Sequence, residues 1–156
     1  MDPHQADLVG ISLCSKVGRA CYIPVGHKSP KCLKKDAVIK KLKKILEDPS
    51  IKKIGQNIKF DFIVFYKCGI TLSSMEDTML MSYVLDAGKN RHNMDTLSEI
   101  HLGHKTISFK EMVGTGKKEI NFSEVELDKA KDYAAEDADI TFRLYKKFIK
   151  NLKSEK

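Results

Sequence analysis

The chain has 156 residues, of which 42% are hydrophobic and 31% charged, and its formal net charge is +7. This length supports one domain with its own core, without disulfides or structural metals. The sequence has no long apolar run and no basic-then-apolar start, so we expect neither a membrane span nor a signal peptide. The four cysteines lack CxxC spacing, which is typical of reduced thiols in a cytosolic protein.

The chain begins with a predicted β-hairpin. Apolar residues alternate with other residues over 7–14 and again over 19–25, as expected for two half-buried strands. Residues 15–18, with the sequence SKVG, form the expected turn.

A lysine-rich helix follows, with Asp36 as the expected N-cap and an end before Pro49. Its predicted apolar face consists of Val38, Leu42, Ile45 and Leu46. The lysines occupy the other face, where they are solvated charges or, as an alternative, contacts to a polyanion.

Two strand–helix units come next. In the first unit we expect a short strand at 51–56 and a helix at 57–68. In the second we expect a short strand at 70–75 and a helix at 77–88. Asn57 and Asp77 stand at the helix starts, where their side chains favour capping.

A short helix is expected at 94–102, followed by a mostly irregular segment over 104–122. Ser123 and Glu126 have the spacing of a capping box in front of the final helix. Strands that come first and then alternate with helices predict an α/β or α+β domain.

The final helix carries a carboxylate on its apolar face. Residues spaced alternately by three and four lie on one side of a helix, and here they are Leu127, Ala130, Ala134, Asp137, Thr141, Leu144 and Phe148. Asp61 lies similarly among Ile58, Phe62 and Phe65. An unpaired buried carboxylate is costly, so each acid needs a partner.

A divalent cation would satisfy both acids if the two helices aim them at one point. Tyr133, one turn before Asp137, is placed to orient a water molecule. A buried lysine or a capping group would satisfy each acid equally well. Asp132, Glu136 and Asp139 lie off the apolar face and are predicted to be solvated charges.

Four ordered blocks of the sequence resemble one known family. They are GQNIKFD (55–61), DTMLMSYVL (77–85), RHNMDTLSEIHLGHKTISF (91–109) and YAAEDADIT (133–141). Together they resemble the proofreading 3′→5′ exonuclease domain of bacterial DNA polymerase I, a member of the DEDD exonucleases. The likeness extends over nearly the whole chain, so residues 1–156 are expected to be one exonuclease domain of a larger, cytoplasmic, nucleoid-associated polymerase.

The resemblance implies an RNase H-like α/β fold, with a mixed sheet flanked by helices, and a two-metal hydrolysis. Asp61 and Asp137 would be catalytic metal ligands for Mg²⁺ or Mn²⁺, with Zn²⁺ as an alternative, and Tyr133 would orient the attacking water. Binding of the 3′ end of single-stranded DNA is implied for Gln56, Asn57, Phe60, Arg91 and Phe109. Phe60 stands where the family commonly has tyrosine.

The family's first motif, a strand with the pattern DxE, has no counterpart in this chain. Two of the four metal-binding carboxylates would then be absent, so we expect weakened metal binding and little activity from the chain alone. We also expect the central strand of the sheet to be missing, with its place taken by a rearrangement, by residues 1–7 or by a second copy of the chain. The functional alternatives are a non-catalytic module that holds single-stranded DNA and, from the same superfamily, an RNA-trimming exonuclease, which the block 91–109 disfavours.

Overall fold

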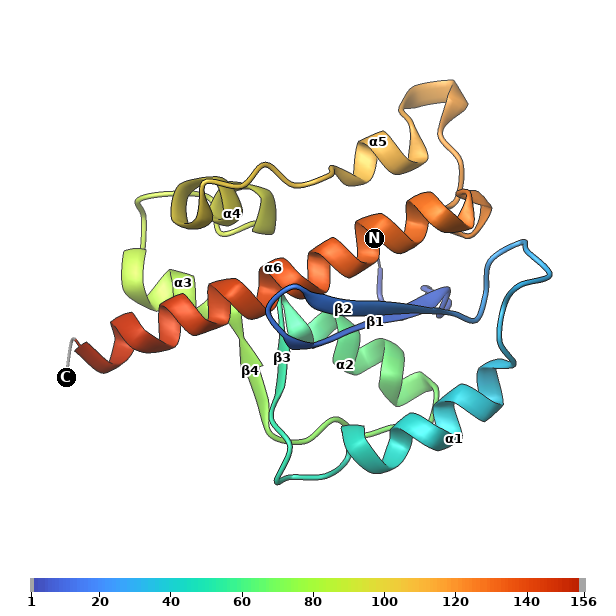
Figure 1. The fold of residues 1–156 in the computed structure, drawn as a ribbon, viewed down its shortest axis with the longest axis horizontal. Coiled ribbons are helices and arrows are strands. Elements are labelled where there is room, and N and C mark those ends of the chain that lie inside the picture. The colour runs from blue at the N-terminus through green and yellow to red at the C-terminus, as the bar shows by residue number, and fades with distance from the viewer. Residues whose placement is uncertain (1, 155–156) are drawn as a thin grey trace.

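The computed structural model describes residues 2–154 of the chain, and one long helix organises it (Figure 1). The strands are β1 (Gly10–Lys16), β2 (Arg19–Pro24), β3 (Lys53–Gly55) and β4 (Met75–Asp77). The helices are α1 (Lys35–Leu46), α2 (Ile58–Lys67), α3 (Thr78–Asp86), α4 (Met94–Leu102), α5 (Phe109–Val113) and α6 (Leu127–Ser154), with short 3₁₀ helices η1 (Gly116–Lys118) and η2 (Phe122–Glu124). The class expected from the sequence, a mixed α/β domain, is confirmed.

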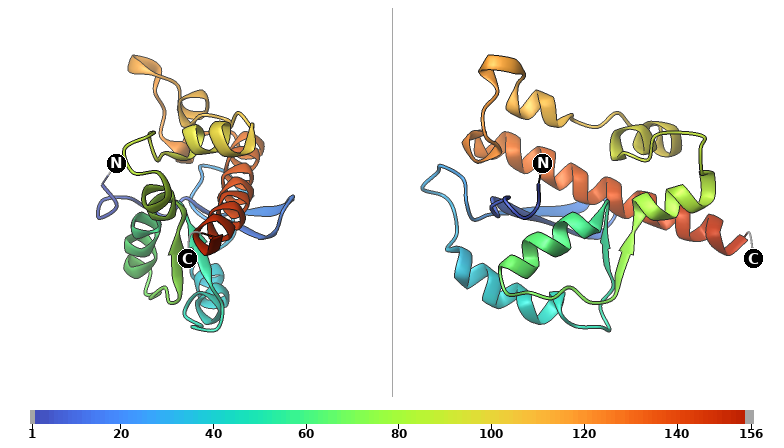
Figure 2. Two further views of the ribbon diagram at one scale, coloured as in Figure 1. Left: turned by 90° about the vertical axis from the view of Figure 1, so that its left-hand side faces the viewer. Right: turned by 180° about the vertical axis from the view of Figure 1, so that it is seen from behind.

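Helix α6 contacts β1, β2, β3, α3, α4 and α5 and so forms the spine of the domain (Figures 1 and 2). Its buried residues follow the predicted helical spacing and are Ala130, Ala134, Ile140, Thr141, Leu144 and Phe148. The predicted apolar face is therefore confirmed, with Ile140 added at its margin. Leu144 and Phe148 are fully buried in a cluster with residues of α3 and α4.

The strands form two separate two-stranded sheets within residues 2–154. β1 and β2 make the predicted antiparallel hairpin, whose turn contains Gly18 at a φ of +75°. β3 and β4 are parallel, with Lys53 opposite Met75. The expected single mixed sheet is thus divided in two, and both parts pack against α6.

Asp77 stabilises the beginnings of two helices. Its Oδ1 accepts hydrogen bonds from the backbone N–H of Met79 (2.9 Å), in α3, and of Asn57 (2.9 Å), while Oδ2 accepts from the N–H of Ile58 (3.1 Å), in α2. The prediction that Asp77 is an N-cap is confirmed. Asn57 occupies the N-cap position of α2 as predicted, but its backbone is left-handed (φ 56°) and, contrary to the prediction, its side chain makes no cap hydrogen bond.

We expect Asp77→Ala to lower the free energy of unfolding by about 2 kcal/mol, because both helix starts lose their acceptor. Urea unfolding monitored by circular dichroism measures the change. Asp36→Ala is the matched control, since the Asp36 side chain provides no cap for α1. An equal loss in the two variants would contradict this role for Asp77.

Three further sequence predictions about helix starts and faces need correction. Helix α1 has Lys34 at its N-cap position, so Asp36 is not the cap. Ile45 is 50% exposed, and Ile39 packs against the core instead. The box predicted for Ser123 with Glu126 is also wrong, since the capping boxes observed are Ser108 with Glu111 and Asn121 with Glu124. These boxes order part of the segment that was predicted to be irregular.

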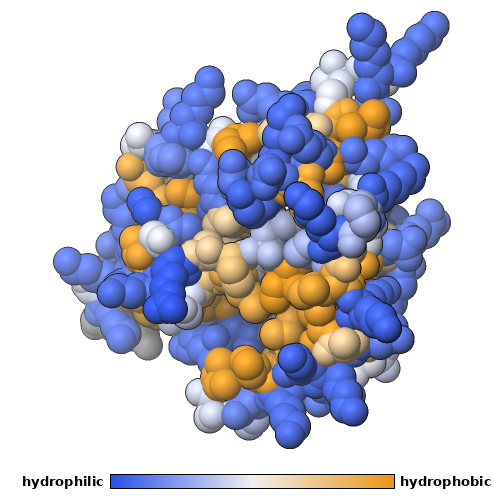
Figure 3. All heavy atoms as spheres, turned by 45° about the vertical axis from the view of Figure 1, so that its right-hand side comes forward, coloured by the Kyte–Doolittle hydropathy of each residue, from blue (hydrophilic) through white to orange (hydrophobic). Residues whose placement is uncertain are grey.

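The outer face of α3 remains uncovered by the described residues. Leu80, Tyr83 and Val84 are 59%, 58% and 69% exposed. Figure 3 shows another view of the surface, in which hydrophilic residues surround an apolar area. No helix in the described part of the chain is long and apolar enough to cross a membrane.

Candidate active site

Asp137 lies on the face of α6 that packs against the rest of the domain. Its helical neighbours Ala134 and Thr141 are each only 8% exposed. The Oδ1 atom of Asp137 is buried and has no hydrogen-bond partner among residues 2–154. Neither the buried lysine nor the capping group that the sequence left open therefore satisfies this oxygen. A buried acceptor in this state favours a ligand that supplies a positive charge.

Burial raises the pKa of Asp137 to about 7, while a hydrogen bond from Tyr133 lowers it and the nearby charges of Glu136 and Asp95 raise it. The pKa of Tyr133 is raised by burial and then by the charge of Asp137. Its phenol therefore stays protonated at neutral pH and remains a hydrogen-bond donor. Together the two side chains form a donor next to a carboxylate that prefers a proton or a cation.

Asp61 lies in the first turn of α2, at the surface. Burial of its carboxyl group by the surrounding protein raises its pKa to about 6, and the charge of Asp77 adds to the rise. Because the residue remains exposed, water screens part of this effect. The charge of Asp77 acts on Asp61, whereas the charges of Glu136 and Asp95 act on Asp137. No group of three or more metal-ligating side chains exists in the described residues.

Gln56 and Asn57 form the turn between β3 and α2. The Gln56 side chain donates from Nε2 to the backbone carbonyl of His92 (2.8 Å) and accepts at Oε1 from the Thr78 hydroxyl (2.5 Å). Phe60 is partly buried on the following helix turn. The structure thus brings the turn at 56–57 to the loop that precedes α4.

Arg91 lies in that same loop, exposed to solvent and next to His92. Phe109 is the first residue of α5 and is 39% exposed. Its ring stacks on Phe122 (centroids 5.9 Å apart) and lies 6.1 Å from the ring of Tyr133. Phe109 and Tyr133, distant in sequence, therefore meet beside Asp137.

Sequence reasoning predicted the wrong exposure for two of the three acidic residues that lie off the apolar face of α6. Asp132 is a solvated charge as predicted, with its side chain 68% exposed. The predictions for Glu136 and Asp139 are wrong, because their side chains are only 18% and 16% exposed. Asp139 accepts a hydrogen bond from the N–H of Gly18 (2.6 Å) and pairs with Arg143 (2.8 Å). Periodicity places these acids off the apolar face, but it does not show that other segments cover the flanks of the helix.

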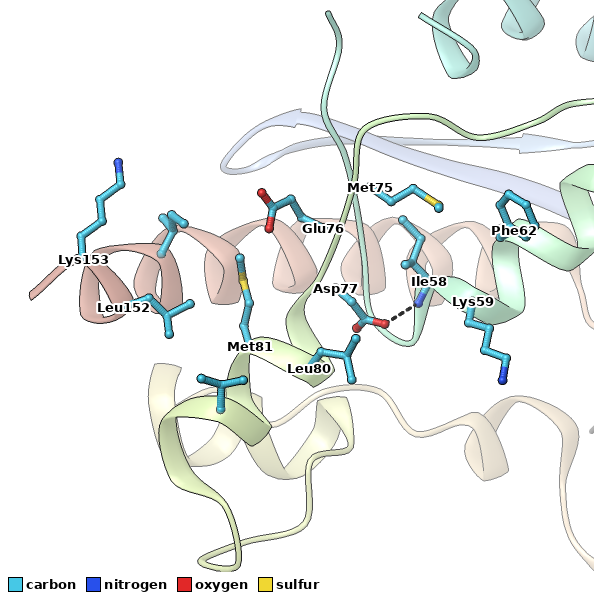
Figure 4. A pocket seen from close by; sticks show the side chains of 12 residues that line it. Ile58, Lys59, Phe62, Met75, Glu76, Asp77, Leu80, Met81, Leu152 and Lys153 are labelled. Carbon is cyan, nitrogen blue, oxygen red and sulfur yellow. Dashed lines mark hydrogen bonds between the residues drawn. The ribbon is translucent and has the colours of Figure 1, made fainter. Parts of the chain in front are cut away.

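An apolar groove of about 790 Å³ lies elsewhere, between α2, β4, α3 and the end of α6 (Figure 4). It is lined by Ile58, Lys59, Phe62, Met75, Glu76, Asp77, Leu80, Met81, Val84, Ile149, Leu152 and Lys153. None of the predicted site residues lines this groove. The candidate site therefore consists of the surroundings of Asp137.

Known structures share this fold. NrnC from Brucella melitensis has a TM-score of 0.74, at 21% identity, over 99% of this chain and 69% of NrnC. Other NrnC structures contain bound Mg²⁺ or pGG. A structure described as the POL domain of Pol1 from M. smegmatis, in complex with DNA primer-template and dNTP, has a TM-score of 0.66 at 17% identity over 95% of this chain and 22% of that chain. The chain therefore shares its fold with NrnC and with part of the Pol1 chain.

A model of the family described as 3′-5′ exonuclease matches residues 1–153. DNA polymerase I of Pseudomonas aeruginosa is 42% identical over 160 residues, which cover 99% of this chain and 18% of that protein. DNA polymerase I of Rhizobium leguminosarum is 42% identical over 167 residues, covering 93% and 16%. The chain thus spans less than a fifth of the length of these relatives. It belongs to the 3′-5′ exonuclease family of bacterial DNA polymerase I, as its sequence blocks indicated.

Proposed function

We propose that this chain is the proofreading exonuclease domain of a cytoplasmic DNA polymerase I. It would hydrolyse the 3′-terminal phosphodiester of single-stranded or frayed DNA and release a nucleoside monophosphate. The observation that carries the proposal is the buried, unpartnered Oδ1 of Asp137 beside the protonated phenol of Tyr133. A carboxylate in this state is suited to a cation, and the phenol is suited to a water molecule.

Asp137 and Asp61 would hold divalent cations, Mg²⁺ or Mn²⁺. These ions prefer oxygen ligands, and the unpartnered oxygen of Asp137 fits that preference. The two acids would form only part of a ligand set, because the described residues contain no group of three or more ligands. When bound, such ions neutralise charge on a reacting phosphate and make water a better nucleophile.

The protein's own side chains would bind and orient the substrate. Tyr133 would orient the attacking water with its phenol group. Phe109 would pack against a sugar or base, and Arg91 would contact a phosphate. The pocket for the last nucleotide would be lined by Gln56, Asn57 and Phe60.

We also propose that a further strand, which carries the DxE motif, pairs between β1 and β3. The division of the strands into two sheets supports this proposal. Residues 2–7 form no strand, so they do not fill that position. Without this strand the chain would have little activity, and a second copy of the chain is the alternative source of a pairing edge.

The second candidate function is a non-catalytic module that supports a polymerase and holds single-stranded DNA. The lack of a three-ligand group within residues 2–154 favours it. The exonuclease function predicts that a longer product of the same gene releases nucleotides, and the non-catalytic module predicts that it does not.

A nuclease assay separates the candidates. The chain and a longer product of its gene are incubated with Mn²⁺ and a 3′-labelled single-stranded oligonucleotide, and released mononucleotides are counted. Release by the longer protein alone supports a proofreading domain that needs a further strand. Release by neither protein, at matched folding, supports the non-catalytic module and contradicts the exonuclease.

A further inference from the structure

The segment 103–108, between α4 and α5, runs along α6 and is attached to it (Figures 1 and 2). The Ser98 hydroxyl donates to the carbonyl of His104 (2.8 Å), and the Thr106 hydroxyl donates to Asp95 (2.6 Å). These two bonds hold the segment to α4. Its attachment to α6 depends on a different residue.

Glu136 makes that attachment with both of its carboxylate oxygens. Oε1 lies 2.7 Å from Nε2 of His104, and Oε2 accepts from the backbone N–H of Ile107 (2.7 Å). A carboxylate only accepts hydrogen bonds, so Nε2 of His104 carries a proton. Two bonds to an ionised, mostly buried acceptor are stronger than bonds between neutral groups. Glu136 therefore fixes the end of the segment just before α5 begins.

The position of Phe109 follows from this attachment. Phe109 comes two residues after Ile107, and its ring contacts that of Tyr133. Glu136 lies on α6 three residues after Tyr133 and one before Asp137. The same turn of α6 thus carries the two proposed catalytic side chains and the anchor for the aromatic ring beside them.

We propose that Glu136 is a positioning residue that holds Phe109 against Tyr133 and thereby shapes the surface that receives the 3′ end of the DNA strand. This inference rests on the proposed function, because it assigns Phe109 a contact with the strand. Both carboxylate oxygens of Glu136 are already engaged by His104 and Ile107. Its effect on DNA binding passes through Phe109.

Amide hydrogen exchange tests the attachment without DNA. We expect Glu136→Ala to remove the protection of the Ile107 amide and the NMR contact between the rings of Phe109 and Tyr133. Glu136→Gln should restore much of the protection, because its amide oxygen still accepts from Ile107. Asp132→Ala, which removes the same charge from an exposed position of α6, should leave both signals unchanged. Unaltered protection of Ile107 in Glu136→Ala would overturn the proposal.

A double-mutant cycle tests the consequence for DNA. Affinity for a fluorescent single-stranded oligothymidylate with a free 3′ end is measured by anisotropy in EDTA, so that no cleavage occurs. Phe109→Ala should weaken binding about tenfold, and Glu136→Ala should weaken it by a similar factor. The double variant should lose no more than either single variant, about tenfold in total, because one residue acts through the other. Losses that multiply to about a hundredfold would show that Glu136 acts independently of Phe109 and would overturn the proposal. If the unaltered chain binds no oligonucleotide, the DNA-binding function fails, and the exchange measurement alone decides whether Glu136 positions Phe109.

Discussion

Replacing Asp137 with asparagine is expected to reduce exonuclease activity by at least about a hundredfold, since even groups that only orient a metal ligand are worth ten- to a hundredfold. The amide keeps the shape of the side chain but removes the negative charge that a cation needs. The measurement is mononucleotide release, with Mn²⁺, by the longer gene product that contains this chain. Asp132→Asn is the control, because its exposed carboxylate lies on the same helix. Full activity of Asp137→Asn would remove Asp137 from the mechanism.

The same substitution is expected to change how stability depends on pH. The pKa of Asp137 is raised from the ordinary 3.8 to about 7. Between about pH 4 and pH 7 the folded state therefore keeps a proton on this carboxyl group that the unfolded state has lost. This contribution to stability is complete below about pH 4 and is lost as the pH rises through about 7. The effect of Asp137→Asn on the free energy of unfolding of the metal-free chain should therefore be about 2 kcal/mol more favourable at pH 8 than at pH 4.

Urea unfolding of the metal-free chain at pH 4 and pH 8 measures this effect. The Asp132→Asn variant should follow the unaltered chain at both values. Saturating Mn²⁺ should reverse the sign at pH 8 if Asp137 is a ligand, because the ion then stabilises only the protein that has the carboxylate. An equal pH dependence in all three proteins would contradict the buried, unpartnered state of Asp137.

Truncating Leu144 to alanine is expected to destabilise the domain by about 3–5 kcal/mol. Leu144 is 0% exposed and lies in the cluster that joins α6 to α3 and α4. Removing a fully buried leucine loses its transfer free energy and leaves a cavity that the surrounding helices fill only in part. In a chain of this size the midpoint of thermal unfolding should fall by roughly 10 °C.

Leu80→Ala is the matched control for this prediction, since it makes the same chemical change on α3 at a residue that is 59% exposed. Its cost should stay below about 1 kcal/mol. Scanning calorimetry of both variants compares them. A similar loss in the two proteins would mean that the packing of α6 against α3 and α4 does not dominate the stability.

The sequence determined by itself those features that depend on local periodicity and residue type. The spacing of three and four residues predicted the buried face of α6 and placed Asp137 on it, because a regular helix has only one such face. The alternation over residues 7–25 predicted the hairpin for the same kind of reason. Ordered blocks around Asp61 and Tyr133 indicated the exonuclease family, which the comparisons confirmed.

Only the tertiary structure decided the features that depend on contacts between distant segments. Asp77 caps α2 as well as α3 because β4 lies beside β3, and no spacing along the chain contains that information. Glu136 was taken for a solvated charge, yet the segment 103–108 covers it and uses both of its oxygens. Periodicity tells which side of a helix is apolar. Which neighbour covers each flank is decided by packing, and here packing brings Phe109 to the side of Tyr133.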